Sequence, residues 1–516
     1  MASTTTVKMR PNTLNLDIPP SETKPDEYNY GFNCQFRDGH AIKSLGWQKI
    51  FPDPGVGKPE FLVNVLDEGN NYWVAACDDR ILVTDTNAWF DITPTDGTWA
   101  APIGRNQWTG GVLNGRVVLN NGQSNPWYWS GNTGTPMAAL PGWTAGVTCG
   151  SLRPFKYHLI AMDITTALGN FPDQVAWSSA AEPGGIPLEW TPSPTNDAGD
   201  LQLSATPVPI IDGAALRDQF VVYKQHSSYV LDYVGGTFVF SARKIFASSG
   251  ILGRNCAVEY EGKHYVITDG DVIAHNSQQL ESVFRGRARQ AMFDTISADN
   301  FANSFVALNS SRNEIMFCYP VESGTSNSPT VALCYDVRTG SIGERQIGPT
   351  RHMAWGTVTV TGSATDWDSA TTTWDNAVGV WNAARYNAAD DGVLMAQQNW
   401  VYYLDASVDQ DGVDVFWGVA KQYYDFGAPA VNKTVVRVWP KINSCTTSVI
   451  SMRMASTDTP TEALSYGPYY YFNPLSDEYI DAITSGRYIS FQWSAFGGDV
   501  GFNGFDVELN NSSSRY

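Results

Sequence analysis

Four aspartates lie close together in the segment LDASVDQDGVDV, residues 404–415. Carboxylates at short spacing around a glycine are typical of calcium-binding loops. The spacing departs from that pattern, because Ser407 stands two residues before Asp409 and Gly418 occupies the position of the bidentate glutamate. We therefore predict a solvated acidic loop that binds no metal. Its members are Asp405, Asp409, Asp411 and Asp414.

A second acidic arrangement, Asp366-Trp367-Asp368, places two carboxylates beside an aromatic ring. Glycosidases need two carboxylates at a fixed separation, which acids on a flexible Thr-rich loop do not have. The chain has no G-x-S-x-G, H-E-x-x-H, Walker A or G-x-G-x-x-G motif. We interpret His264 and His275, which flank one hairpin, as turn-adjacent polar residues. The sequence predicts a protein that is not an enzyme and has no catalytic residue and no cofactor.

Three arginines, Arg285, Arg287 and Arg289, form the densest basic cluster of the chain. The segment 277–296 around them predicts a helix, because its apolar residues recur near helical spacing. On that helix Arg285 and Arg289 share a face and Arg287 points away. The cluster suits contact with an acidic neighbouring subunit or with phosphate in a channel, and the alternative is ordinary helix-surface charge. The apolar residues are Leu280, Phe284, Ala288, Ala291 and Met292.

The composition indicates a β-rich protein that repels nucleic acid. Charged residues make up 16% of the 516 residues, below the usual value of about 25%, whereas aromatic residues reach 13%. The formal net charge is −19, from 33 basic and 52 acidic side chains, which disfavours capture of nucleic acid through its phosphates.

The cysteines and the apolar runs indicate a reducing compartment. Seven scattered cysteines without a C-x-x-C pair predict reduced thiols. The first residues, MASTTTVKMR, lack the apolar region of a signal peptide, and no apolar run approaches the ~18 residues of a membrane span. We expect folding in the cytoplasm and no stable membrane insertion.

Strand-turn-strand units recur along the body of the chain. GGVLNGRVVLNN turns at Asn114-Gly115, the strongest short hairpin signal, and EGKHYVITDGDVIAHN turns at Asp269-Gly270. Successive turns lie near 40 residues apart, which is the length of a four-stranded propeller blade. We predict a β-propeller over 51–400 with a loop insertion near 360–390. A pair of β-sandwiches would give similar spacing and is the alternative.

The two ends of the chain differ from this body. Residues 401–516 predict a C-terminal β-sandwich-like domain, in which Ile489, Phe491 and Trp493 share one strand face. Residues 1–50 predict an extended arm followed by the first strands, because Pro19 and Pro20 exclude a helix. The predicted class is all-β with one or few helices. We expect the arm, residues 1–30, to contact other subunits and not its own body.

Three segments resemble, in the same order, the tail nozzle (hub) proteins of short-tailed bacteriophages. The first is DIPP followed by EYNYGFNCQFRDG, within residues 17–39. The second runs from Leu280 through EIMFCYP, which ends at Pro320. The third is GRYISFQWS followed by GFDVELNN, within residues 486–511.

The resemblance implies a virion structural protein in the phage tail, assembled in the host cytoplasm. Such a protein forms a homohexameric ring below the portal and the head-to-tail adaptor. It contacts tail fibres or spikes and a tail-tip or needle protein, and viral DNA passes through it without sequence recognition. The acidic loop would then face the lumen. The alternative is a propeller that binds or degrades polysaccharide.

Overall fold

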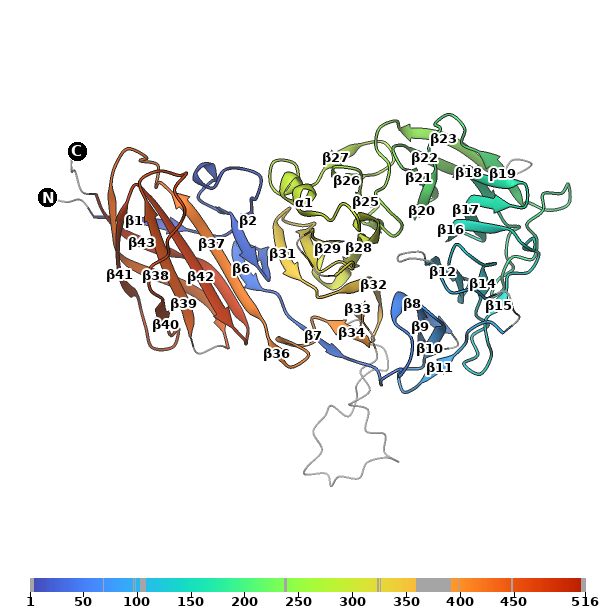
Figure 1. The fold of residues 1–516 in the computed structure, drawn as a ribbon, viewed down its shortest axis with the longest axis horizontal. Coiled ribbons are helices and arrows are strands. Elements are labelled where there is room, and N and C mark those ends of the chain that lie inside the picture. The colour runs from blue at the N-terminus through green and yellow to red at the C-terminus, as the bar shows by residue number, and fades with distance from the viewer. Residues whose placement is uncertain are drawn as a thin grey trace, which may run out of the picture.

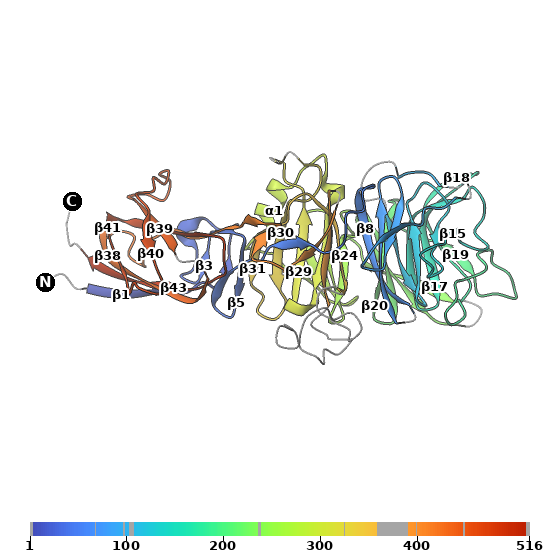
Figure 2. The same ribbon diagram turned by 90° about the horizontal axis from the view of Figure 1, so that it is seen from below.

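The computed structural model describes residues 4–511 except 68, 96, 98, 103–107, 236–238, 323, 325, 359–390, 399, 447 and 448. The molecule is elongated, with a β-propeller at one end and a β-sandwich at the other (Figure 1). Figure 2, turned by 90°, shows the sandwich beside the rim of the propeller ring. The predicted all-β class, a propeller body with a sandwich-like domain, is confirmed.

Five blades of the propeller are separate four-stranded antiparallel sheets. The predicted Asn-Gly hairpin is present, since Asn114 and Gly115 have φ values of 49° and 80° and Leu113 pairs with Arg116. Positive φ at both turn residues is the geometry that Asn-Gly favours. The first blade consists of β8 (Pro59–Asp67), β9 (Asn70–Cys77), β10 (Ile81–Thr84) and β11 (Trp89–Asp91), and the second of β12 (Thr109–Leu113), β13 (Arg116–Asn120), β14 (Trp127–Tyr128) and β15 (Ala138–Ala139). The third consists of β16 (Thr148–Phe155), β17 (His158–Thr166), β18 (Gly169–Trp177) and β19 (Gly199–Gln202), and the fourth of β20 (Ile210–Leu216), β21 (Gln219–Lys224), β22 (Ser228–Tyr233) and β23 (Phe240–Phe246). The fifth consists of β24 (Ala257–Tyr260), β25 (Lys263–Ile267), β26 (Val272–His275) and β27 (Leu280–Ser282).

Two further blades complete the ring, so the described residues form seven blades. The sixth is β28 (Phe305–Asn309), β29 (Glu314–Tyr319), β30 (Val331–Asp336) and β31 (Ile342–Gln346). The seventh is β32 (Thr350–Thr357), β33 (Asp391–Gln397) and β34 (Trp400–Leu404), with β7 (Trp47–Lys49) as its outer strand. The ring closes because β32 packs against β8 of the first blade. The predicted insertion near 360–390, with Asp366 and Asp368, lies outside the described residues.

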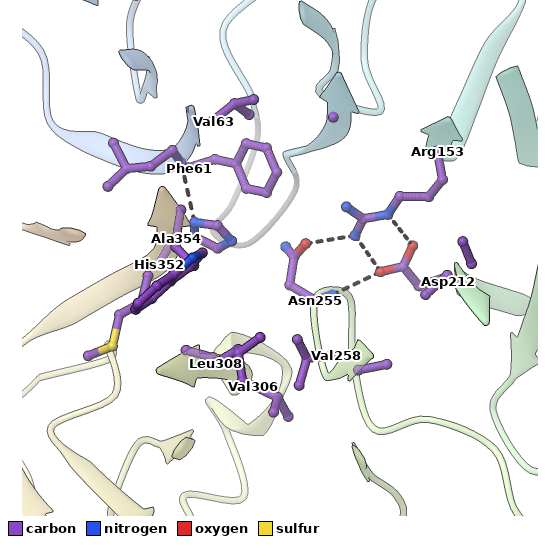
Figure 3. Close-up of a pocket in the computed structure, with 18 of the residues that line it drawn as sticks. Phe61, Val63, Arg153, Asp212, Asn255, Val258, Val306, Leu308, His352 and Ala354 are labelled. Atoms are coloured by element: carbon purple, nitrogen blue, oxygen red, sulfur yellow. Dashed lines mark hydrogen bonds and ion pairs between the residues drawn. The ribbon is translucent and has the colours of Figure 1, made fainter. Parts of the chain in front are cut away.

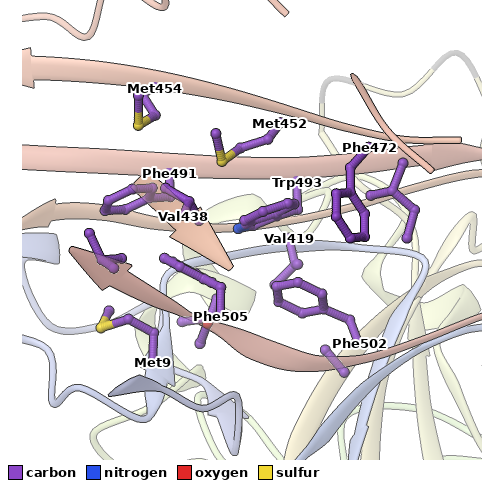
Figure 4. Close-up of a cluster of buried hydrophobic side chains, with 14 of the residues drawn as sticks. Met9, Val419, Val438, Met452, Met454, Phe472, Phe491, Trp493, Phe502 and Phe505 are labelled. Atoms are coloured by element: carbon purple, nitrogen blue, oxygen red, sulfur yellow. The ribbon is translucent and has the colours of Figure 1, made fainter. Parts of the chain in front are cut away.

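The sandwich packs two sheets around one apolar core. The predicted common face of Ile489, Phe491 and Trp493 is confirmed, since all three are fully buried between the sheets. Figure 4 shows Phe491 and Trp493 in this core. Phe502 and Phe505 of the opposite sheet contact the Trp493 ring. One sheet contains β1 (Thr4–Met9), β6 (His40–Lys43), β38 (Lys433–Cys445), β41 (Ile480–Gly486) and β43 (Val500–Asn511); the other contains β4 (Tyr30–Phe32), β37 (Phe416–Tyr424), β39 (Ile450–Thr457), β40 (Tyr470–Phe472) and β42 (Tyr488–Phe496).

A single ten-stranded sheet joins the two domains. The strand β5 (Cys34–Arg37) pairs with β31 of the sixth blade and with β6, and β6 pairs with β43 of the sandwich. Across this joint Arg37 Nη2 donates to Glu314 Oε2 at 3.0 Å, and both side chains are mostly buried. The sheet therefore runs without a break from blade to sandwich.

The expectation that residues 1–30 avoid their own body is wrong for the part of the arm that is described. β1 pairs with β43 along its whole length, and β2 (Thr13–Leu14) pairs in parallel with β3 (Glu27–Tyr28). A short 3₁₀ turn, η1 (Pro20–Glu22), lies between them, and the buried Lys421 Nζ of β37 donates to the carbonyl oxygen of Glu27 at 2.8 Å. The prolines remove only single amide donors, so the extended residues between them find partners within the chain.

The predicted helix over 277–296 is much shorter than expected. Leu280–Ser282 is the fourth strand of blade five, and the helix α1 covers only Arg289–Thr295. Gly286, with φ of 68°, turns the chain between them. Two 3₁₀ turns follow, η2 (Phe301–Asn303) and η3 (Ser310–Arg312). No helix in the described ranges is long and apolar enough to cross a membrane.

Candidate functional site

A cavity of about 440 Å³ lies where the inner strands of the seven blades meet (Figure 3). All seven inner strands, β8, β12, β16, β20, β24, β28 and β32, contribute lining residues. Most of the wall is apolar, and the charged part is Arg153 of β16 with Asp212 of β20. The cavity is thus an axial site with one concentrated polar side.

Arg153 and Asp212 form a two-point ion pair. Arg153 Nε donates to Asp212 Oδ1 at 2.9 Å and Nη2 donates to Oδ2 at 2.6 Å. Burial acts to raise the pKa of Asp212, but the Arg153 charge and hydrogen bonds from Ser151 and from the Asn255 amide hold that pKa below its ordinary value. The carboxylate is therefore ionised and fully engaged, and it has no free lone pair for a general base.

Asn255 extends this pair to other blades. Its Oδ1 accepts from Arg153 Nη2 at 2.7 Å, its amide donates to Asp212 Oδ2 at 2.9 Å, and its Nδ2 donates to the Trp108 carbonyl at 3.2 Å. Its own carbonyl accepts from the amide of Val306 at 2.9 Å. The network therefore fixes the positions of blades two to six around the axis.

His352 lies on the other side of the cavity, as Figure 3 shows. Its Nδ1 accepts from the Leu62 amide at 3.3 Å, and its ring contacts the Phe61 ring at 4.3 Å between ring centres, with 41° between the ring planes. Burial, with the Arg153 charge acting in the same direction, lowers the pKa of His352 to about 3. The neutral ring carries its proton on Nε2 when Nδ1 accepts. The cavity therefore offers mutually neutralised charges and a neutral imidazole, which suits water or a small uncharged molecule.

The sequence contains a signal for this network, although none of the predicted site residues belongs to it. Arg153 stands in the strand TCGSLRPF and Asp212 in the strand IIDGAAL, where each is the only charged residue of its strand. A charge inside a strand that is otherwise apolar or uncharged predicts a buried partner. The sequence alone does not say which partner, because the two residues belong to different blades.

His264 and His275 lie beside turns, as interpreted from the sequence, but they belong to the core and are not solvent-exposed. They face each other across the β25–β26 pair, and both are buried. Tyr223 of blade four joins them, with its hydroxyl 2.6 Å from His264 Nδ1 and 2.7 Å from His275 Nε2. Burial lowers the pKa of His264 to about 4 and that of His275 to about 3, so both are neutral at pH 7. This hydrogen-bonded chain ties blade four to blade five.

The three predicted arginines lie in different environments around the start of α1. Arg287 is turned inward, where Nη2 donates to the Val283 carbonyl at 2.9 Å, and Arg289 Nε donates to the Gly270 carbonyl at 2.8 Å. Arg285 is exposed and makes no hydrogen bond or ion pair within the described ranges. Arg285 precedes the helix, so the two do not share a helix face, but Arg285 and Arg289 line one pocket together with Asp17.

The carboxylate that lies at the start of α1 is that of Asp17, which belongs to the N-terminal arm of the same chain. Asp17 Oδ2 accepts from the Arg289 amide at 3.0 Å, and Oδ1 accepts from the Ala291 amide at 3.1 Å. A carboxylate on the free amides of a first helical turn stabilises that turn. Asp17 therefore anchors the arm to α1.

The four predicted loop aspartates occupy two environments. The side chain of Asp405 is only 12% exposed; it accepts from Arg345 Nη2 at 2.6 Å and forms an ion pair with Arg312 Nε at 3.0 Å, so the predicted solvated position is wrong for it. The fully buried Arg345 needs a carboxylate partner, which explains why the Asp405 side chain points into the chain. The other three lie on the hairpin of β35 (Asp409–Gln410) and β36 (Val413–Asp414), where Asp409 pairs with Asp414 and Asp411 lies 3.1 Å from Lys49. Among the described residues no three His, Cys, Asp or Glu side chains are grouped to hold a metal ion.

Comparison with known proteins shows likeness of fold alone. No family model matches the sequence, and no curated protein matches it. The AfRom2 CNH domain is 9% identical, with 70% of this chain and 98% of that chain covered and a TM-score of 0.34. The WD40 β-propeller domain of Doa1 is 10% identical, with 70% and 96% covered and a TM-score of 0.35. The extracellular domain of the putative one-component system BT4673 from B. thetaiotaomicron is 10% identical, with 89% and 59% covered and a TM-score of 0.41.

Proposed function

We propose that this chain is the nozzle subunit of a short phage tail. Six copies would form a ring below the portal and adaptor, retain the packaged DNA and let it leave. The observation that supports this most is where the three family-like segments lie in the fold. They are far apart in the sequence, yet strands of all three belong to the ten-stranded sheet that joins propeller and sandwich.

The first segment contacts each of the other two directly. β5 of the first segment belongs to the same sheet as β28 and β29 of the second and β43 of the third. Tyr28 and Phe36 of the first segment share a buried core with Trp493 and Phe505 of the third. Arg37 of the first segment is ion-paired with the second through Glu314. The first segment therefore contacts both of the others, which is consistent with the three segments having one structural role.

A continuous joint and an acidic surface suit such a conduit. The shared sheet lets the two domains move as one body, as a ring wall beside packaged DNA requires. The net charge of −19 repels phosphates, so passing DNA is not retained by adhesion.

Electron cryomicroscopy tests this proposal on virions produced from the genome that encodes the chain. An antibody fragment against the propeller marks the subunit in averaged tail images. We expect a six-fold ring of labelled subunits between adaptor and tail tip. A chain absent from purified virions, or recovered as a free monomer with polysaccharide affinity, would refute the proposal and support the alternative of a polysaccharide-binding propeller.

A further inference from the structure

The outer face of the five-stranded sandwich sheet carries an arginine among tyrosines. Met452 of β39 and Trp493 of β42 point into the core. Neighbouring residues of a strand point to opposite faces, so Arg453 and Gln492, which pair across these strands, lie on the outer face. Tyr471 of β40 pairs with Ser451 on the same face.

The arginine is held in place by its neighbours. Its Cζ atom lies 4.5 Å from the ring centre of Tyr466 and 5.3 Å from that of Tyr469. Its Nε donates to Gln492 Oε1 at 2.8 Å. No described residue accepts a hydrogen bond from its two Nη atoms, and no described carboxylate lies within ion-pair distance. The guanidinium is thus oriented while its two outer donors stay open.

The tyrosines beside it are open to solvent. Tyr469 is 51% exposed and Tyr471 is 69% exposed, and their rings stack at 6.4 Å with 21° between planes. We call Arg453, Tyr466, Tyr469, Tyr471 and Gln492 the tyrosine–arginine face. Tyrosine and arginine are the residue types that dominate binding energy at protein interfaces. The side chains of this face already contact one another, so they lose little conformational freedom on binding.

We propose that the tyrosine–arginine face binds a second copy of this chain. A surface carboxylate of the neighbouring copy would pair with the two Nη atoms of Arg453, and the neighbour's backbone would pack on Tyr469 and Tyr471. Charge complementarity favours this occupant, because the chain has 52 acidic against 33 basic side chains and Arg453 lacks a carboxylate among the described residues. The inference rests on the proposed ring and assigns its contact to the sandwich.

Hydroxyl-radical footprinting of the free chain and of assembled tails tests this contact. We expect the reactivity of Tyr469 and Tyr471 to fall at least fivefold in tails. Tyr157 on the propeller, which is 58% exposed, serves as the matched reference in the same samples. Equal reactivity of Tyr469 and Tyr471 in tails and in the free chain would overturn the inference and leave the ring intact. Absence of the chain from tails would overturn the ring and the inference together.

A photo-crosslinking residue identifies the occupant. With Tyr471→p-benzoylphenylalanine, we expect a cross-linked product of two copies of the chain in tails. A product that joins the chain to a different protein, or to polysaccharide, would refute a second copy as the occupant.

Side-chain removal tests the role of the face in assembly. Arg453→Gln and Tyr471→Ser should each lower the yield of assembled tails at least tenfold, whereas Tyr157→Ser should not. Thermal unfolding of each free variant shows whether the chain still folds. Normal tail yield from Arg453→Gln and Tyr471→Ser would contradict the inference.

Discussion

Glu344 at the joint makes stability depend on pH. It lies on β31, where it pairs with Cys34 of β5. Burial raises its pKa from 4.5 to about 7, and the hydrogen bond from Gln346 Nε2 at 3.3 Å acts in the opposite direction. The folded chain therefore holds this proton more tightly than the unfolded chain does.

The size and sign of the effect follow from linkage. A raised pKa contributes stability that is fully present below pH 4.5 and is lost as the pH rises through 7. At about 1.4 kcal/mol per pKa unit, the complete loss is roughly 3.5 kcal/mol. Glu344→Gln has no proton to lose, so we expect its free energy of unfolding to exceed that of the wild type by up to about 3.5 kcal/mol at pH 8 and by little at pH 4.

Urea unfolding monitored by tryptophan fluorescence, repeated from pH 4 to pH 8, measures this difference. Other titrating groups cancel when the variant is compared with the wild type at each pH. Glu182→Gln, at an exposed position of the propeller, should stay within about 0.5 kcal/mol at every pH. A stability difference for Glu344→Gln that does not change between pH 4 and pH 8 would refute the reasoning.

Three further substitutions test contacts described above. Asp17→Ala removes the acceptor of the first amides of α1 and should cost about 1 kcal/mol, seen as faster hydrogen exchange at Ala291; unchanged exchange would contradict the cap. Tyr223→Phe leaves His264 and His275 without their buried partner and should cost about 1–3 kcal/mol for each group in urea unfolding; an unchanged midpoint would argue against it. Asp405→Ala leaves two arginines without their carboxylate and should cost about 3–5 kcal/mol in thermal unfolding; a loss below about 1 kcal/mol would mean that solvent compensates the charges.

Local signals predicted the hairpins and the strand faces. Asn114-Gly115 adopts its turn because the two residues themselves tolerate positive φ. Ile489, Phe491 and Trp493 share a face because alternation is a property of one strand. Both features are decided within about ten residues, so the sequence contains them.

Pairings between distant segments could not be predicted in this way. Nothing local in residues 47–49 shows that they complete the seventh blade, and nothing in β1 identifies β43 as its partner. The segment 277–296 has helical spacing, but blade five needs a fourth strand, and Leu280–Ser282 forms it. The hydrogen-bond partner that His264 and His275 share, Tyr223, reaches them from another blade.

Closure of the seventh blade by β7 also affects how the chain folds during synthesis. β7 ends at Lys49, and its partner β34 ends at Leu404, so about 350 residues are made between these two strands of one blade. At about 5–20 residues per second, β7 waits roughly 20 to 70 s on the ribosome with its edge unpaired. β1 waits longer still, because β43 is the last strand made. Nascent chains are therefore exposed to aggregation throughout synthesis, and truncation near the C-terminus removes the partner of the strand that was made first.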